Sequence, residues 1–294
     1  MSVQQLVGVV GRGVFPAGHL VITADDLGFT RGDGCFDATR VVTRADGSST
    51  IDNLDAHFNR FDASITGVGG TPIDRAAWWA TIDEALSQWT TPGEAVLKIM
   101  YSNGQETQSF TEGTHRATEV FTLTQMSASN ISDRAGVDAI TLNRGMSSDA
   151  FTEAPWLLGG VKSLAYAVNV AAKREAHRRG AQDVLFTSSD GYCLEAPTSA
   201  LVVLLDGTLV TTPAEGTGIL KSITQRMAFA GAEDAGFVTD HRLLTVAQVQ
   251  DSNGAWFLSS VRGVVPLLSL DGQSLPLHRE LTERLRVWAR FTDH

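Results

Sequence analysis

The spacing of apolar residues predicts strands and a helix in the first part of the chain. Residues 34–43 form an apolar-rich run that predicts a strand, Asp46-Gly47 predicts a tight turn, and residues 49–51 predict the returning strand. A helix is predicted next, over residues 53–67, because apolar side chains recur there at helical spacing. Its buried stripe consists of Leu54, Phe58, Phe61 and Ile65.

A second helix and two further strands complete this part. Residues 75–89 carry tryptophan and aliphatic side chains at helical spacing, so we interpret the tryptophans as core residues and not as a binding platform. Strands are predicted over residues 95–101 and 118–124. We therefore predict a small N-terminal α/β domain over residues 1–126, and a linker at residues 127–130, where the side chains are small and polar.

Beyond the linker the pattern changes to paired strands between helices, and two of the pairs are joined by Asp-Gly turns. The predicted strands cover residues 137–143, 183–188, 192–195, 201–205, 208–212 and 255–259. Three helices are predicted: one that ends near residue 179, one over residues 222–235 and one over residues 278–291. Residues 131–294 are therefore predicted to form a larger C-terminal domain, and the fold class is α+β.

Composition and charge exclude several classes of protein. The formal net charge of −10 and the pI of about 5.1 argue against a nucleic-acid partner. No apolar run reaches the length of about 18 residues that a membrane span needs, and no signal peptide is recognisable, so we expect a cytoplasmic protein. Cys35 and Cys193 are too few for a disulfide framework, and the seven histidines show no metal-binding spacing, so no metal is expected.

Lys162 lies in a nearly uncharged stretch, Trp156-Leu157-Leu158-Gly159-Gly160-Val161-Lys162-Ser163-Leu164, which we expect to end a strand. Desolvation of an ammonium lowers its pKa and frees the amine for attack on a carbonyl group. The alternative is a lysine that extends its charged end into water.

Four other segments suggest a use for such an amine. Glu195 ends a predicted strand, Ile223-Thr224 begins a helix, Ser259-Ser260 closes a strand, and Arg60 lies off the buried face of its helix. A reactive lysine, a carboxylate, an arginine and hydroxyl groups at a helix N-terminus are what pyridoxal 5′-phosphate requires. Each residue also has a structural alternative: a solvated strand end for Glu195, a surface ion pair for Arg60, and a helix cap for Thr224.

In matching order, these segments resemble those of the fold-type IV pyridoxal-phosphate enzymes. That family includes branched-chain and D-amino-acid aminotransferases and 4-amino-4-deoxychorismate lyases. The resemblance rests on Arg31-Gly32-Asp33-Gly34-Cys35-Phe36, His57-Phe58-Asn59-Arg60-Phe61, Val161-Lys162-Ser163-Leu164 with Glu195, Gly218-Ile219-Leu220-Lys221-Ser222-Ile223-Thr224 and Phe257-Leu258-Ser259-Ser260. It implies a small N-terminal domain and a larger C-terminal domain with a β-barrel-like core flanked by helices.

The resemblance also implies a role for each residue. Lys162 would bind the cofactor and transfer the proton, and Glu195 would pair with the pyridine nitrogen. The phosphate would be held by Arg60, Ile223, Thr224, Ser259 and Ser260. Candidates for contact with the substrate are Phe36, Arg40, Tyr101 and Arg262, with Arg144 as a further arginine. The family resemblance implies a homodimer as well.

The choice of reaction depends on how substrate carboxylates are recognised. D-Amino-acid transaminases carry an Arg-x-His motif on the loop that follows the strand ending near Tyr101, and this chain has no cation at residues 102–109. Gly34-Cys35-Phe36 with Arg40 is closer to the aminodeoxychorismate lyases. We therefore favour a lyase that releases 4-aminobenzoate and pyruvate. A D-amino-acid or branched-chain aminotransferase, a bifunctional enzyme and an inactive binding homologue are the alternatives.

Overall fold

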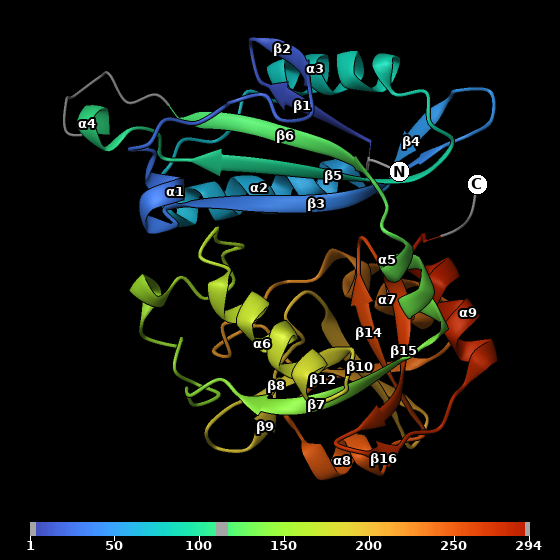
Figure 1. Ribbon diagram of the computed structural model, residues 1–294. Helices are drawn as coiled ribbons and strands as arrows, with labels where there is room; N and C mark the ends of the chain where they lie inside the picture. Colours follow the sequence, from blue (N-terminus) through green and yellow to red (C-terminus); the bar gives the residue numbers. More distant parts are fainter. Residues whose placement is uncertain (1–3, 110–116, 292–294) are drawn as a thin grey trace. The chain divides into compact units, whose positions relative to one another are not determined.

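The structure, a computed structural model, describes residues 4–109 and 117–291 (Figure 1). Its strands are arranged in two sheets. Within those two ranges, no helix combines the length and the apolar character that a membrane span requires.

Contacts within the chain divide it into two compact units. Unit 1 contains the described residues up to Ser127 together with the segment Val161–Tyr166. Unit 2 contains Ala128–Gly160 and the described residues from Ala167 onward. By its contacts the Lys162 segment therefore belongs to unit 1, whereas the sequence analysis assigns it to the C-terminal domain.

Unit 1 is built on a six-stranded antiparallel sheet with the strand order β2-β1-β6-β5-β3-β4. Its strands are β1 (Gln5–Val9), β2 (Gly13–Pro16), β3 (Gly34–Thr43), β4 (Ser49–Ile51), β5 (Gly93–Ser102) and β6 (Thr118–Gln125). The long strands β3 and β5 lie side by side and form the part of the sheet that matters for the site (Figure 1).

Two helices, α2 (Leu54–Gly67) and α3 (Arg75–Gln88), share one hydrophobic core with the sheet of unit 1. The predicted stripe of α2 is buried in this core. In α3, Trp78 is fully buried but Trp79 is 42% exposed, so the prediction that the tryptophans of this helix are core residues is wrong for Trp79. The short helices α1 (Leu27–Arg31) and α4 (Glu106–Ser109) complete the helices described in this unit.

The pairing of β3 with β5 separates their side chains onto two faces of the sheet. Cys35 is opposite Tyr101, and both belong to the core that includes α2. Because side chains alternate along a strand, Phe36 and Lys98 lie on the other face. Cys35 and Phe36 are adjacent in the sequence, but Cys35 faces the core shared with α2 and Phe36 faces the opposite side of the sheet.

Unit 2 contains a ten-stranded sheet in which the strands follow the order β12-β11-β10-β14-β15-β7-β8-β9-β13, with β16 paired to β15. The elements are α5 (Ala128–Ser132), β7 (Val137–Asn143), α6 (Ala167–Arg178), β8 (Asp183–Thr187), β9 (Tyr192–Cys193), β10 (Ala200–Leu205), β11 (Thr208–Thr211), α7 (Ile223–Asp234), β12 (Val238–His241), β13 (Leu244–Thr245), α8 (Val246–Gln250), β14 (Gly254–Ser259), β15 (Gly263–Leu270), β16 (Gln273–Ser274) and α9 (Arg279–Trp288). Two short 3-10 helices, η1 (Asp133–Ala135) and η2 (Pro155–Leu157), are also present.

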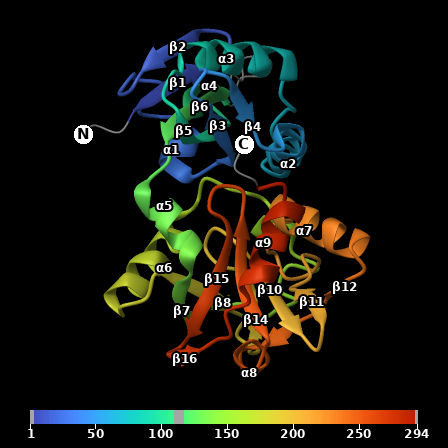
Figure 2. The ribbon, with the colours of Figure 1, turned by 90° about the vertical axis from the view of Figure 1, so that its right-hand side faces the viewer.

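The sheet of unit 2 curves around a core of its own. Strands that are distant in the sheet order, such as β9 and β10, contribute Cys193 and Leu201 to the same buried cluster. On its other face, β10, β14 and β15 pack against α7 and α9, which lie next to each other (Figure 2). This is the α+β fold with a barrel-like core flanked by helices that the family resemblance implies.

The segment predicted as a linker is partly helical. Residues 127–130 run into α5, which begins at Ala128 and continues into η1. The small polar residues Ser127 and Ser129 are compatible with a loop, but they also tolerate a short helix when neighbouring segments anchor it. The boundary between the two units falls between Ser127 and Ala128, within this segment, and its role as an interdomain linker stays a prediction.

Candidate active site

The backbone of the Lys162 segment is fixed against the beginning of β3. The amide of Phe36 donates to the Lys162 carbonyl at 2.9 Å, and the amide of Leu164 donates to the Gly34 carbonyl at 2.9 Å. The amide of Lys162 itself donates to Ser64 Oγ of α2 at 3.3 Å. The sequence predicts that Lys162 ends a regular strand, and this is wrong: Lys162 immediately precedes an isolated bridge that Ser163 forms with Cys35.

Gly34 lies where β3, β5 and the Lys162 segment meet. A Cβ atom at this position would lie 2.3 Å from the Tyr101 carbonyl oxygen and 2.8 Å from a Leu164 methyl carbon. The first contact is with the backbone of β5, so a larger residue would disturb the pairing of β3 with β5, and it would also displace the Leu164 side chain.

The amine of Lys162 lies against two aromatic rings. Its Nζ is 4.7 Å from the centroid of Phe36 and 5.6 Å from that of Tyr166, and the two rings meet edge to face at 5.2 Å. Ring faces attract a cation and exclude water, so they hold the amine without supplying an acid partner. Tyr166 was missed by the sequence analysis, although it lies only four residues after Lys162.

Arg60 is held by a buried acid that the sequence analysis also missed. Asp37 is fully buried and accepts from Arg60 Nε at 2.8 Å and from Arg60 Nη2 at 2.7 Å. His57 Nδ1 lies 2.8 Å from the same carboxylate. Burial raises the pKa of Asp37, but Arg60 and the hydrogen bonds more than offset this effect, so the pKa lies well below its usual range.

His57 completes this group as a neutral residue. Burial lowers the pKa of His57, although the hydrogen bond and the charge of Asp37 oppose the shift. A neutral imidazole that donates from Nδ1 leaves Nε2 as an acceptor, and this atom is buried with no hydrogen-bond partner in the described part of the chain. The Asp37–His57–Arg60 cluster therefore contains one negative and one positive charge.

In unit 2, Glu195 lies between a backbone donor and a cation. Both of its carboxylate oxygens are 3.3 Å from the amide nitrogen of Leu220, and Arg144 Nη1 is 4.0 Å from one of them. The Glu195 side chain is only 16% exposed. A carboxylate is the kind of group that can pair with a protonated ring nitrogen.

The N-terminus of α7 lies next to hydroxyl groups. Ser222 caps the helix and accepts from the amide of Gln225, so the first amides, those of Ile223 and Thr224, have no acceptor within the helix. Thr224 Oγ1 forms a hydrogen bond with Ser260 Oγ at 2.9 Å. Ser259 Oγ instead accepts from the amide of Arg262 at 3.3 Å, so Ser260 is the serine that lies with Thr224.

Two of the predicted substrate residues are buried in ion pairs. Arg40 is fully buried, donates to Asp52 at 2.8 Å and lies 3.5 Å from Glu94. Arg262 is 4% exposed and donates to Asp183 at 2.6 Å. Guanidinium groups that neutralise buried carboxylates stabilise the fold, so this arrangement contradicts a role for Arg40 or Arg262 as a substrate ligand.

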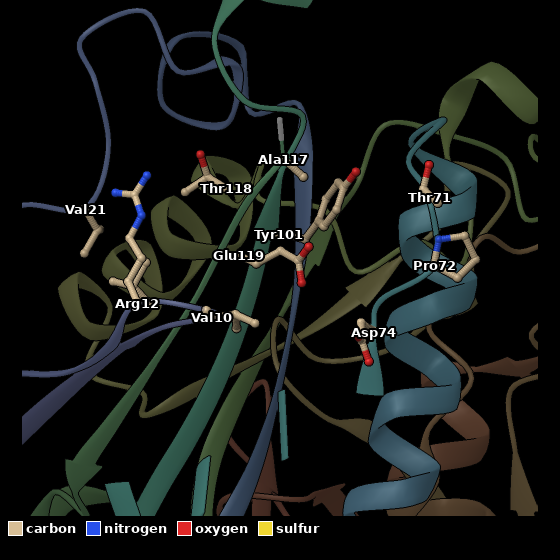
Figure 3. Close-up of a pocket in the computed structure, with 12 residues that line it drawn as sticks. Val10, Arg12, Val21, Thr71, Pro72, Asp74, Tyr101, Ala117, Thr118 and Glu119 are labelled. Atoms are coloured by element: carbon tan, nitrogen blue, oxygen red, sulfur yellow. The ribbon is translucent and has the colours of Figure 1, made fainter. Parts of the chain in front are cut away.

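Tyr101 is also displaced from the expected place. It lies on the sheet face opposite to Phe36 and lines a pocket of about 600 Å³ in unit 1 (Figure 3). Glu119, its partner on β6, lines the same pocket, and burial raises the pKa of that carboxyl group. The residues around this pocket do not include Lys162 or Phe36, so Tyr101 is not grouped with the amine.

The structure thus groups the predicted residues in two sets. Lys162, Phe36 and Arg60 lie in unit 1, and Glu195 lies in unit 2 with the α7 residues Ile223 and Thr224 and with Ser260. The first set supplies an amine and a guanidinium group, and the second supplies a carboxylate and anion-binding donors.

Comparison with known proteins identifies the class. A model of the family described as amino-transferase class IV matches residues 34–270. The chain therefore belongs to the class IV aminotransferase family, whose members are pyridoxal-phosphate enzymes. The matched region includes every residue of the two sets.

Individual relatives narrow the comparison. The chain is 35% identical over 272 residues to the bifunctional aminodeoxychorismate lyase / D-amino acid transaminase of Mycobacterium tuberculosis, and the match covers 90% of each chain. A hypothetical aminotransferase from M. tuberculosis in its PLP-bound form is similar with a TM-score of 0.88 and 34% identity, covering 97% of this chain and 98% of that chain. A fold IV-transaminase from Curtobacterium pusillum has a TM-score of 0.87 and 32% identity, covering 99% and 100%.

The Asp37–His57–Arg60 cluster gives a first prediction. Replacing Asp37 by Asn should lower the free energy of unfolding by about 3 kcal/mol or more at pH 7, because it leaves Arg60 without its buried counter-charge. Since the folded-state pKa of Asp37 is depressed, its contribution is complete above the unfolded-state pKa. The difference between wild type and variant should therefore shrink as the pH falls below about 4.

Urea denaturation of both proteins at several pH values measures this difference. Asp46→Asn is the matched control, because Asp46 is an exposed turn residue bonded to Ser48. Equal stability of wild type and Asp37→Asn at pH 7 would show that the cluster contributes nothing to folding.

Proposed function

We propose that the protein is a pyridoxal 5′-phosphate-dependent 4-amino-4-deoxychorismate lyase that releases 4-aminobenzoate and pyruvate. We further propose that it transfers amino groups from D-amino acids, because the M. tuberculosis relative is named for both activities and covers the chain nearly from end to end. The observation that carries the proposal is the Lys162 amine against Phe36 and Tyr166, in a chain that belongs to the class IV family.

The residues present fit the cofactor. The paired hydroxyl groups of Thr224 and Ser260, beside the free first amides of α7, are suited to a phosphate group. Arg60 would add a cation whose orientation is set by Asp37, and Glu195 would pair with the pyridine nitrogen. When bound, pyridoxal phosphate supplies a protonated ring that accepts electrons from the carbon attached to the substrate nitrogen.

Lys162 is the residue that moves the proton. Its Nζ, held against apolar ring faces, would remove the proton from the ring carbon that bears the substrate amine. The electron pair of the broken carbon–hydrogen bond makes the six-membered ring of the substrate aromatic as the carbon–oxygen bond to the enolpyruvyl group breaks. The departing enolpyruvate takes up a proton and becomes pyruvate. In transamination the same amine would instead return the proton to the cofactor.

The homodimer that the family resemblance implies and the cytoplasmic location stay predictions. The small number of charged residues, 19% of the chain, is compatible with an apolar subunit interface.

The second prediction concerns the attachment site. Borohydride treatment of the purified yellow protein should fix the cofactor on the peptide that contains Lys162, and Lys162→Ala should abolish turnover. The exposed Lys221, which pairs with Glu215 at 3.1 Å, is the control: Lys221→Ala should still be labelled at Lys162. Label on the Lys221 peptide, or a protein without cofactor, would refute the assignment.

The third prediction concerns Glu195. Glu195→Gln should keep the cofactor but lose turnover by orders of magnitude, because an amide does not hold the proton on the ring nitrogen. The matched control is Glu215→Gln, an exposed acid in the same unit. Absorbance spectra and initial rates measure both properties. A Glu195→Gln enzyme with the wild-type rate would make Glu195 a structural residue.

The fourth prediction separates the two activities. One enzyme preparation is given aminodeoxychorismate and, separately, D-alanine with 2-oxoglutarate. We expect 4-aminobenzoate to form much faster than D-glutamate, because residues 102–109 contain no cation for a small substrate. Comparable rates of the two reactions would indicate a bifunctional enzyme that catalyses both equally well. Amino transfer without formation of 4-aminobenzoate would disprove the proposed lyase activity.

A further inference from the structure

Lys98 brings a second ammonium group to the ring that holds the Lys162 amine. Lys98 Nζ lies 4.6 Å from the centroid of Phe36, and Lys162 Nζ lies 4.7 Å from the same centroid. The two nitrogen atoms are therefore less than about 10 Å apart, whichever side of the ring each occupies. All three residues belong to unit 1.

The strand register explains why Lys98 is there. Lys98 is opposite Ala38 in the β3–β5 pair, and its side chain lies on the same sheet face as Phe36. The preceding and following residues, Leu97 and Ile99, belong to the core on the other face. Lys98 is thus fixed by two buried neighbours and directed to the face where Lys162 lies.

The charge of Lys98 is not neutralised by an acid. In the ranges that the structure describes, no carboxylate lies within ion-pair distance of Lys98. Its side chain is half-buried, and burial lowers the pKa of Lys98.

The other titratable groups around Lys162 balance one another. Asp37 of β3 is paired with Arg60 of α2, and burial favours the neutral form of His57. Tyr166 contributes an aromatic ring beside the amine. Among the described residues of unit 1, Lys98 is therefore a charge near Lys162 that forms no ion pair with a carboxylate.

We propose that the Lys98 ammonium group disfavours protonation of Lys162 and so keeps this amine available as nucleophile and base. Two like charges in a partly desolvated region repel, so a charged Lys98 makes a second charge on Lys162 less favourable. Lys98 is in this sense a positioning residue that acts through Lys162. The catalytic meaning of the inference rests on the proposed function.

The test measures the pKa of Lys162 in the full-length chain prepared without cofactor. Limiting acetic anhydride is added across a pH series, and the acetylated fraction of the Lys162 peptide is determined by mass spectrometry, with the exposed Lys221 as internal reference. In Lys98→Met the pKa of Lys162 should rise by about one unit, so that acetylation near neutral pH slows by up to about tenfold.

Lys98→Arg is the matched control, because it keeps the charge and changes the shape. It should leave the pKa of Lys162 close to the wild-type value. Arg174→Met, which removes an exposed charge from α6, should also leave it unchanged. In the cofactor-loaded enzymes, the acidic limb of the pH–rate profile should move to higher pH in Lys98→Met alone.

An unchanged Lys162 pKa in Lys98→Met would overturn the inference. An equal rise in Lys98→Met and Lys98→Arg would also overturn it, because packing and not charge would then be the cause. The outcome is separable from the proposed function: borohydride labelling elsewhere would refute the Lys162 cofactor assignment, while the acetylation series would still decide whether Lys98 controls the amine.

Discussion

The site depends on the attachment of the Lys162 segment to the beginning of β3. Two backbone hydrogen bonds, from the Phe36 amide to the Lys162 carbonyl and from the Leu164 amide to the Gly34 carbonyl, fix a segment that has no regular secondary structure of its own. Gly34 lies at this junction, where a Cβ atom would meet the Tyr101 carbonyl oxygen of β5 and the Leu164 side chain. The same contact that holds the backbone also sets the Phe36 ring beside the amine, so fold and reactivity are coupled at one point.

Two buried carboxylates of unit 1 are neutralised by arginines. Asp37 pairs with Arg60, and Asp52 pairs with Arg40. A buried charge without a partner is costly, so most of the charge on this sheet is used for folding. Lys98 differs because no carboxylate of the described residues forms an ion pair with it, and a half-buried position makes that cost tolerable. This charge beside the Lys162 amine is the observation on which the inference about Lys98 rests.

The sequence predicted most regular elements, because local pattern determines them. The strand at residues 34–43 and the helix at residues 53–67 appear as β3 and α2, since both have clear periodicity and turn signals. Strand β15, Gly263–Leu270, was missed because it is buried along most of its length and so has no alternation. Tyr101 was misplaced because its sheet face depends on the register with β3, which local pattern does not encode.

The candidate site shows the same division. Lys162, Glu195 and the α7 residues could be named from short motifs, because a motif records which chemical groups the cofactor needs. Short motifs could not identify Asp37, Tyr166 and Lys98. Asp37 contacts Arg60, which is distant in the sequence, and Lys98 and Tyr166 are recognised only by the aromatic contacts around Phe36 and Lys162. Arg40 is the opposite case. Its place in a motif suggested that it binds substrate, but its guanidinium group pairs with Asp52 and Glu94. The partition between lyase and transaminase is also not encoded in short motifs. In the proposed function both reactions use the Lys162 amine, and they would diverge through the surroundings that decide where its proton goes.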